Sequence, residues 1–407
     1  MADDRAQRAK SCLYGLAAIP MVWIAATAAA FPLTTDLAVA APQGWDRMSA
    51  AELLIYIERI DSHGLQPADY EPEELSRAIR LGDDGELERQ ADESFGLVAH
   101  DLTNGHVRPG QRRRFYIATE PLESAEIARL IDHALASSNV VGTLDGLAPR
   151  NDQYTALRAA LGELPASSSA ERRKIEASLE RWRWMPHEIG EQHLLVNIPE
   201  YRLHVLADGK EVASHRVIVG KPQTPTPQFS AEVTGVVFNP SWHVPQSIVA
   251  ESVGALVRNN PQVARARGYT WSYSGGGLQV TQQPGPGNAL GEMKIDMPNP
   301  FTVYLHDTSN RELFDRDQRA LSHGCIRTDK PFDLARLLLG GTDWTPARID
   351  EVVASRKTTR VALERPMPVY TVYMTAYAAP DGTVSYFDDP YSFDQAINRL
   401  LDDRARS

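Results

Sequence analysis

Apolar positions in the first half of the chain recur at the spacing of an amphipathic helix. The runs SAAELLIYIERID (49–61) and LESAEIARLIDHALASS (122–138) place apolar residues three and four positions apart, on one helix face. Proline and glycine interrupt this pattern at HGLQPADY (63–70) and NGHVRPG (104–110), where we expect turns. The pattern predicts a helical scaffold domain over residues 44–165.

A polar stretch and a charged helix follow this domain. PASSSAERR (165–173) is the polar break, and RRKIEASLERWRWM predicts a helix that Pro186 stops. We expect a connecting helix within residues 166–190.

The hydrophobic period changes from residue 192 onward. Short runs rich in β-branched residues alternate with polar positions and are bounded by Gly, Pro and Asn, which is the pattern of strands. The turns ADGK (207–210) and PDGT (380–383) predict hairpins. The sequence therefore predicts an α+β protein whose second domain, residues 191–395, is mostly antiparallel β. The strand-like runs are HLLVNIP, YRLHVLADGKEVASHRVIVG, AEVTGVVFNP, LQVTQQP, FTVYLHD and TRVALE.

Two segments of the second domain depart from the strand pattern. KPFDLARLLLG (330–340) predicts a helix that glycine ends. Residues 247–277 predict a helix plus loop inserted between strands. Insertions of this kind often act as lids over a site.

Residues 1–40 carry the pattern of an export segment. A basic start precedes the uncharged stretch SCLYGLAAIPMVWIAATAAAFPLTT, and AVA at residues 38–40 matches the small-residue pattern of a cleavage site. The stretch is also long enough for an uncleaved membrane anchor. Either alternative places the bulk of the chain outside the cytoplasm.

Charge and motif content exclude several classes of function. The formal net charge of -11 argues against nucleic-acid binding, which needs clustered Lys and Arg. No HExxH or CxxC spacing occurs, so we expect no metal. PGPGN (284–288) lacks the strand and helix of a phosphate-binding loop, so we expect no nucleotide and no other cofactor.

The chain has two cysteines, and one of them stands in the motif SHGC (322–325). Cys12 lies in the export segment, so Cys325 is the only thiol of the remaining chain and is a candidate free, reactive group. A cysteine nucleophile needs a base and oxyanion donors. His323 is close by, and His306 ends an apolar strand, with fifteen residues separating it from Ser322. The alternative is that Cys325 is a small buried hydrophobic residue and that the histidines are structural.

The pattern His–fifteen residues–SHGC–Ile–Arg resembles the signature of the L,D-transpeptidases of the YkuD family. Further segments resemble the large periplasmic, YcbB-like branch of that family, and the resemblance spans residues 44–395. They are HGLQPADY, DLTNGHVRPG, ERWRWMP, VNIPEYRLHV, VGKPQTPTPQFS, VVFNPSWHVPQSI, QQPGPGNALGEMK and MPNPFTVYLHDT. The resemblance implies a separate peptidoglycan-binding module, but this chain runs almost directly from the scaffold into the catalytic domain.

The resemblance also implies roles for individual residues. Cys325 is the expected nucleophile and His306 the expected base, held by the carbonyl of Asp307. The amides of Gly324 and Cys325 are the expected oxyanion donors. The expected catalytic residues are Cys325, His306, His323 and Gly324, and the expected substrate-binding residues are Arg327, Tyr304, Ser322 and Asp307.

The implied activity is cross-linking of peptidoglycan in the periplasm. The thiolate attacks the third-residue carbonyl of a donor tetrapeptide stem, D-alanine leaves, and the thioester passes to a stem-peptide amine to give a 3-3 cross-link. Water as acceptor gives L,D-carboxypeptidase activity, and a protein amine tethers that protein to the wall. Other wall-synthesis enzymes are possible partners, and carbapenems are expected inhibitors. A wall-binding scaffold with a decayed site, and a hydrolase of wall peptides, stay open as alternatives.

Overall fold

The computed structural model describes residues 44–165, 167–275, 277–379 and 381–403. The predicted signal peptide or membrane anchor, with Cys12, lies outside these residues. Within them, no helix has the length and apolar content that a membrane crossing needs.

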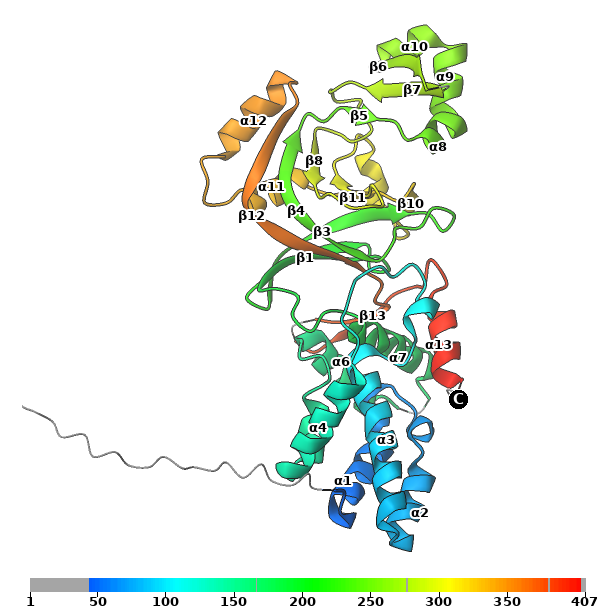
Figure 1. Ribbon diagram of the computed structural model, residues 1–407. Coiled ribbons are helices and arrows are strands. Elements are labelled where there is room, and N and C mark those ends of the chain that lie inside the picture. Colours follow the sequence, from blue (N-terminus) through cyan, green and yellow to red (C-terminus); the bar gives the residue numbers. More distant parts are fainter. Residues whose placement is uncertain (1–43, 166, 276, 380, 404–407) are drawn as a thin grey trace, which may run out of the picture. The chain divides into compact units, whose positions relative to one another are not determined.

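The first part of the described chain is helical, as the apolar spacing predicts (Figure 1). Several helices begin at a side-chain cap: Asp46 accepts the amide of Ser49 at 2.7 Å, and Asp83 accepts that of Glu86 at 3.1 Å. The elements are α1 (Arg47–Glu58), η1 (Ile60–His63), η2 (Pro67–Tyr70), α2 (Pro72–Leu81), α3 (Asp84–Asn104), η3 (Pro109–Gln111), α4 (Ser124–Ala136), α5 (Val140–Asp145) and α6 (Asp152–Glu163).

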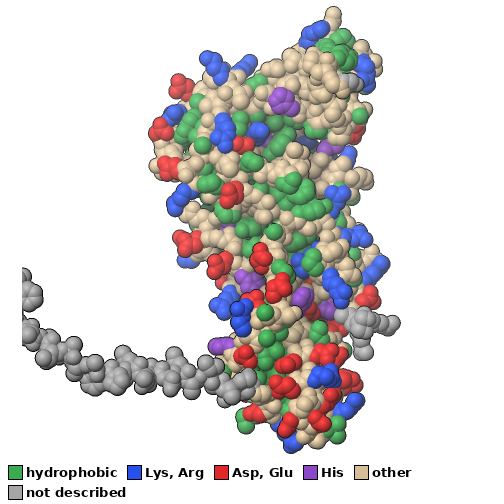
Figure 2. All heavy atoms as spheres, in the orientation of Figure 1, with side chains coloured by type: hydrophobic (Ala, Val, Ile, Leu, Met, Phe, Trp, Pro, Cys, Tyr) green, Lys and Arg blue, Asp and Glu red, His purple; other side chains and the backbone are tan. Residues whose placement is uncertain are grey.

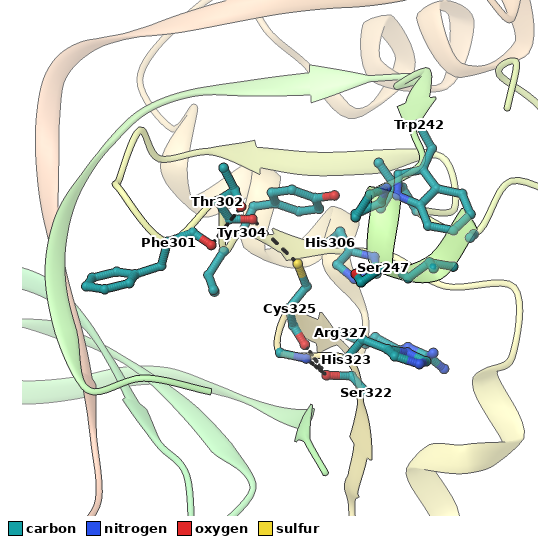
Figure 3. Close-up of a pocket in the computed structure, with 16 residues that line it drawn as sticks. Trp242, Ser247, Phe301, Thr302, Tyr304, His306, Ser322, His323, Cys325 and Arg327 are labelled. Carbon is teal, nitrogen blue, oxygen red and sulfur yellow. Dashed lines mark hydrogen bonds between the residues drawn. The ribbon is translucent and has the colours of Figure 1, made fainter. Parts of the chain in front are cut away.

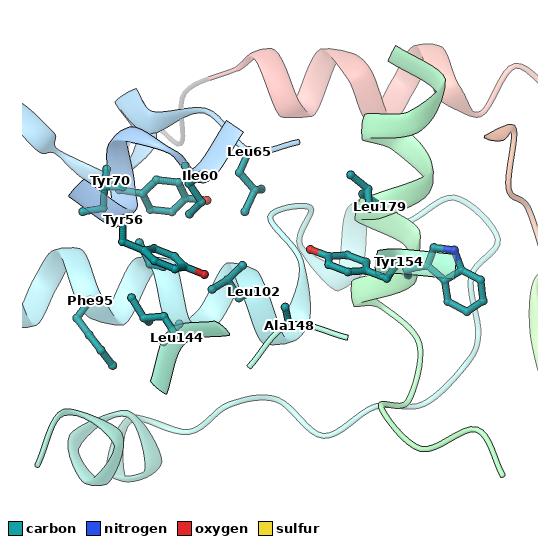
Figure 4. Close-up of a cluster of buried hydrophobic side chains, with 14 of the residues drawn as sticks. Tyr56, Ile60, Leu65, Tyr70, Phe95, Leu102, Leu144, Ala148, Tyr154 and Leu179 are labelled. Carbon is teal, nitrogen blue, oxygen red and sulfur yellow. The ribbon is translucent and has the colours of Figure 1, made fainter. Parts of the chain in front are cut away.

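A core of leucine and aromatic side chains holds these helices together (Figure 4). Phe95 and Leu102 on α3 are fully buried, and the hydroxyl of buried Tyr70 donates to Asp101 at 2.9 Å. Acidic side chains gather over the helical region on the face shown in Figure 2. These side chains lie on solvated helix faces.

The helix α7 (Ser169–Arg183) leads into the second part of the chain. It lies within the range predicted for the connecting helix, and only five residues separate it from α6. Trp182 and Trp184 near its end are buried, so they pack the interior and are not exposed for stacking on sugars.

The second part is built on one nine-stranded, mostly antiparallel sheet, as predicted. The strand order is β10-β3-β11-β9-β8-β4-β12-β1-β2, and an additional pairing of β2 with β3 closes the sheet on itself. Its strands are β1 (Gln192–Asn197), β2 (Arg202–Ala207), β3 (Lys210–Gly220), β4 (Phe229–Phe238), β8 (Met293–Asp296), β9 (Leu305–His306), β10 (Ala320–Ser322), β11 (Ile326–Thr328) and β12 (Thr359–Val372). Three further elements, η5 (Arg311–Asp315), α11 (Pro331–Leu338) and α12 (Pro346–Ser355), lie between strands, and α11 confirms the helix predicted after the SHGC motif.

The predicted helix-plus-loop insertion is wrong in its second half. A helical run is followed by a hairpin, and β5, β7 and β6 form a separate three-stranded sheet (Figure 1). The segment YTWSYS alternates aromatic and small polar residues, which is a strand pattern. We call residues 246–282 the lid. It contains α8 (Gln246–Ile248), the π-helix η4 (Val249–Val253), α9 (Gly254–Asn259), α10 (Pro261–Ala266), β6 (Tyr269–Ser274) and β7 (Gly277–Gln282), and it packs against β5 (Trp242–His243).

The C-terminal segment returns to the helical region. β13 (Ala376–Ala378) pairs with β14 (Val384–Tyr386), and α13 (Asp394–Asp402) packs on α7. Gln153 on α6 exchanges two hydrogen bonds with the backbone of Ala378, at 2.6 and 2.9 Å. Residues 376–402 thus pack on the helical region.

Candidate active site

The SHGC motif forms a tight turn between β10 and β11. Gly324 has φ of +117°, a conformation that a residue with a side chain rarely adopts. The hydroxyl of Ser322 spans the turn: it donates to the carbonyl of Cys325 at 2.5 Å and accepts the amide of Gly324 at 3.1 Å. These two bonds fix the backbone on which Cys325 stands.

Two sequence expectations change at this turn. Ser322 is buried and its hydroxyl is used within the turn, so it shapes the motif and is not free to bind a substrate. The amide of Gly324 already donates to Ser322, so it does not serve as an oxyanion donor in this conformation. The amide of Cys325 is left as the expected donor. Spacing alone does not reveal a hydrogen bond that depends on the turn geometry.

The segment after β3 stabilises the turn through hydrogen bonds. The hydroxyl of Thr226 donates to the carbonyl of Gly324 at 2.8 Å and accepts the amide of Gly220 at 2.9 Å. Tyr391, from the C-terminal segment, donates to the carbonyl of Gly220 at 2.6 Å. Sequence reasoning did not assign these supporting residues, although VGKPQTPTPQFS stood out as a motif.

His306 lies beside the cysteine turn because β9 and β11 are parallel neighbours. The register places His306 opposite Arg327. The Nδ1 atom of His306 lies 2.5 Å from the carbonyl oxygen of Asp307, which can only accept a hydrogen bond. Nδ1 therefore carries the proton, and Nε2 has a free lone pair. The imidazole has the tautomer that a general base needs.

The backbone carbonyl of Asp307 holds His306, and the Asp307 side chain does not line the pocket. Its carboxylate is buried, accepts the amide of Glu292 at 2.9 Å and contacts Arg311 at 3.1 Å. Gly291 packs so closely that a Cβ there would lie 2.2 Å from Oδ2 of Asp307. Substrate binding by Asp307 stays a prediction, and in this structure these contacts occupy its side chain.

Cys325 and His306 are both uncharged in the resting site, so they do not form an ion pair. Burial, with the nearby Arg327 guanidinium, lowers the pKa of His306 to about 3. Burial raises the pKa of the Cys325 thiol, although hydrogen bonds from Tyr304 and the charge of Arg327 act against this shift. At neutral pH the pair is therefore a thiol and a neutral imidazole.

The thiol points into a pocket of about 350 Å³ beneath the lid (Figure 3). Its Sγ atom lies 3.8 Å from the carbonyl oxygen of Thr302. The ring of Tyr304 meets that of His306 edge-on, with centroids 5.7 Å apart, so both residues face the same space. Apolar side chains of β5 and the lid, including Trp242 and Ile248, form the opposite wall.

Arg327 is the cation of this pocket. It is partly buried, and among the described residues no carboxylate forms an ion pair with it. Burial lowers the pKa of Arg327, but its guanidinium stays charged. It is available to a substrate carboxylate, as the sequence suggested.

His323 contacts the lid. Its Nε2 atom lies 2.9 Å from a carboxylate oxygen of Glu251 on η4, and Lys221 lies 3.6 Å from the other oxygen. This cluster of His323, Glu251 and Lys221 joins the cysteine turn to the lid. His323 itself lines the pocket, and its contact with Glu251 also joins the turn to the lid.

No group of three or more His, Cys, Asp or Glu residues suited to a metal ion occurs within the described ranges. The chemistry of the pocket is that of a cysteine, a histidine and an arginine.

Comparison with known families agrees with this fold. Residues 191–353 match the family described as L,D-transpeptidase catalytic domain (YkuD), and residues 41–161 match the one described as Scaffold domain. The chain thus joins a scaffold domain to a YkuD-type L,D-transpeptidase catalytic domain.

One curated relative is a Haemophilus influenzae protein named "Putative L,D-transpeptidase". It is 31% identical over 305 residues, which cover 70% of this chain and 60% of the relative. The chain therefore spans less than two thirds of the length of that relative.

Solved structures of L,D-transpeptidases also align with part of the chain. The L,D-transpeptidase from Mycobacterium smegmatis is 14% identical over 45% of this chain and 58% of its own, with a TM-score of 0.24. The catalytic domain of the Enterococcus faecium enzyme acylated by ertapenem is 14% identical over 46% of this chain and 99% of its own, with a TM-score of 0.24.

Proposed function

We propose that this protein is a peptidoglycan L,D-transpeptidase in which Cys325 is the nucleophile and His306 the general base. The observation that carries the proposal is the Nδ1 contact of His306 with the carbonyl of Asp307, which leaves Nε2 free beside the only thiol of the described chain. A neutral imidazole with a free lone pair, a thiol and a cation in one apolar pocket suit acyl transfer.

The acylation step moves one proton twice. Sγ of Cys325 bonds to the third-residue carbonyl carbon of a donor tetrapeptide stem while its proton passes to Nε2 of His306. The amide of Cys325 stabilises the oxyanion. The bond between that carbon and the D-alanine nitrogen then breaks, and His306 gives its proton to the leaving amine. A thioester on Cys325 remains.

Deacylation repeats these moves in reverse. A stem-peptide amine attacks the thioester, His306 takes the amine proton, and the carbon–sulfur bond breaks as the proton returns to Sγ. The product is a 3-3 cross-link. Arg327 binds a substrate carboxylate by a charge-assisted hydrogen bond, and the apolar wall of the pocket excludes water that would otherwise hydrolyse the thioester.

The setting of this activity is the cell wall. The export pattern of residues 1–40 supports a periplasmic enzyme, either free or anchored at its N-terminus. The partners are peptidoglycan stem peptides. With a catalytic domain of this type, the protein should also be acylated at Cys325 by carbapenems.

Product analysis tests the proposal. The full-length protein is incubated with a disaccharide-tetrapeptide and the products are identified by mass spectrometry, with Cys325→Ala alongside. We expect a dimer whose mass is that of two donor molecules less one D-alanine, and no such dimer from the variant. Tripeptide alone would establish L,D-carboxypeptidase activity instead, and a dimer formed equally by Cys325→Ala would refute the assigned nucleophile.

A further inference from the structure

A second groove borders the cysteine turn on the side away from the lid. It has a volume of about 340 Å³ and shares Phe301, Val303, His323 and Gly324 with the pocket described above. Neither Cys325 nor His306 lines it. The turn that carries the nucleophile is thus a ridge between two cavities.

The helical domain supplies one wall of this groove. Arg114 and Tyr116, from the segment that follows η3, line it opposite the turn. The ring of Tyr116 packs against that of Phe301, with centroids 4.7 Å apart, although Tyr116 is 53% exposed. A residue of the scaffold domain and a residue of the catalytic domain therefore form one continuous surface.

Hydrogen bonds hold this scaffold segment in place against the sheet. Gln228, which precedes β4 and is 2% exposed, donates its amide to the carbonyl of Arg114 at 2.9 Å and its side chain to that of Arg113 at 3.0 Å. Its own carbonyl accepts the amide of Tyr116 at 2.8 Å. Behind the segment, Phe115 packs edge-on against Trp184 at 5.2 Å. The wall is therefore built into the fold.

The backbone at Arg114 has φ of +50°, which is uncommon for a residue with a side chain. Gln228 holds this conformation through the carbonyl of Arg114. In the described part of the chain no carboxylate forms an ion pair with the Arg114 guanidinium. The groove therefore presents a cation that has no ionic partner of its own.

The chemistry of the reaction decides which part of the substrate enters this groove. The leaving amine and the attacking amine both exchange a proton with His306, so both occupy the pocket that His306 lines. The acyl part of the donor extends from the same carbonyl carbon in the other direction. The second groove lies on that other side of the turn.

We infer that Arg114 and Tyr116 of the scaffold domain bind the donor stem peptide on the acyl side of the reacting carbonyl, with Arg114 pairing with a stem carboxylate. This inference rests on the proposed function and assigns the scaffold domain a part in donor binding. Tyr116 and Phe301 together provide the apolar surface on which the stem lies.

The acylation half-reaction tests the inference in the full-length protein. Release of D-alanine from a disaccharide-tetrapeptide is measured in a single turnover, with enzyme in excess, across a range of concentrations. Arg114→Ala should raise the half-saturating concentration about fivefold and leave the limiting rate within twofold, because the cation binds the stem and does not touch the reacting atoms. Tyr116→Ala should have a similar effect, and Arg114→Lys should restore part of the affinity.

Arg113→Ala is the matched control. Arg113 is an exposed arginine one residue away that does not line the groove, so its replacement removes the same charge and should leave donor binding unchanged. Acylation by a carbapenem, which has no stem beyond the reacting carbonyl, should also be unchanged in every variant and reports an intact site. A donor whose stem carboxylates are amidated should bind the native protein about fivefold more weakly than the unmodified donor does. The Arg114→Ala variant should bind the two donors equally well.

Each outcome decides the matter. Equal effects of Arg113→Ala and Arg114→Ala, or an Arg114→Ala variant within twofold of the native protein, would overturn the inference while leaving the transpeptidase function intact. If the native protein releases no D-alanine at all, the proposed function fails, and the inference falls with it.

Discussion

At the scale of single residues, the two central groups are held in their uncharged forms. Burial lowers the pKa of His306 to about 3 and raises that of Cys325. The thiol is therefore activated only when His306 removes its proton during attack. This differs from cysteine enzymes that rest as a thiolate–imidazolium pair.

The pH dependence of acylation follows from these shifts. The reactive form of the enzyme contains neutral His306. This neutral form becomes protonated only as the pH falls towards the His306 pKa of about 3. We expect the rate of acylation by a carbapenem, followed by rapid mixing, to be nearly constant between pH 5 and pH 8 and to fall below about pH 4. A fall of the rate centred between pH 6 and pH 7 would contradict a neutral resting pair.

His306→Gln provides the control for this profile. Without the base only the thiolate reacts, so the acylation rate at pH 7 should be lower than that of the native protein by a factor of about 100 or more. This rate should increase about tenfold for each unit by which the pH is raised. A variant with the flat profile of the native protein would exclude His306 as the base.

The sequence predicted Cys325 and His306 at the pocket from a lone thiol and a histidine at the end of an apolar strand, and the family resemblance added Tyr304 and Arg327. The sequence did not reveal the part of Ser322 in the turn, because that part depends on a conformation that brings its hydroxyl to the carbonyl of Cys325. Long-range supports, such as Tyr391, have no local signal at all.

At the scale of elements, the lid is the least predictable part of the site. Its helices follow from apolar spacing, but its hairpin depends on β7 pairing with both β6 and β5. Its contact with the cysteine turn runs through Glu251, which reaches His323 and Lys221 across 72 and 30 positions of sequence. A lid held by exposed polar contacts can open without unfolding the sheet.

Removal of this contact should loosen the lid selectively. Glu251→Gln should increase amide hydrogen exchange of residues 246–259 by up to about fivefold, because an exposed ion pair contributes at most about 1 kcal/mol. Exchange of β4 and β12 should not change. Mass spectrometry of the exchanged protein measures both.

Glu232→Gln is the comparison for that experiment. Glu232 is exposed on β4, outside the lid, and its replacement removes the same charge. Equal exchange of the lid in both variants and the native protein would show that Glu251 does not hold the lid.

At the scale of the whole described molecule, the C-terminal segment joins the two domains. The guanidinium of Arg181 on α7 lies 2.7 Å from the carboxylate of Asp394 on α13, and both side chains are buried. Arg181 also lies over the ring of Tyr373, 5.0 Å from its centroid, and Thr375 donates to Asp394 at 2.6 Å. The family match ends at residue 353, yet the chain beyond it supplies β12 and this junction.

Loss of the buried partner should destabilise the protein strongly. Asp394→Asn leaves Arg181 charged and unpaired, so we expect the free energy of unfolding in urea to fall by about 3 kcal/mol. Asp402→Asn, which removes a partly exposed partner of Arg173 on the same helix, should lower it by less than about 1 kcal/mol. Equal effects would mean that burial of the Arg181 pair does not matter to the junction.

The helical first part and the mostly β second part followed from the change of hydrophobic period near residue 192. The closure of the sheet and the contact of the scaffold segment with Gln228 did not, because both pair residues far apart in the chain. Such pairings have no periodic pattern of their own.

The central claim is that Cys325 carries the acyl group of the donor. The most direct test is to mix the full-length protein with a tetrapeptide donor, quench it in acid and determine its mass before and after proteolysis. The account predicts an adduct equal to the donor minus D-alanine on the peptide that contains Cys325, and none in Cys325→Ala. An adduct on another residue, or release of D-alanine by the Cys325→Ala variant at the native rate, would contradict it.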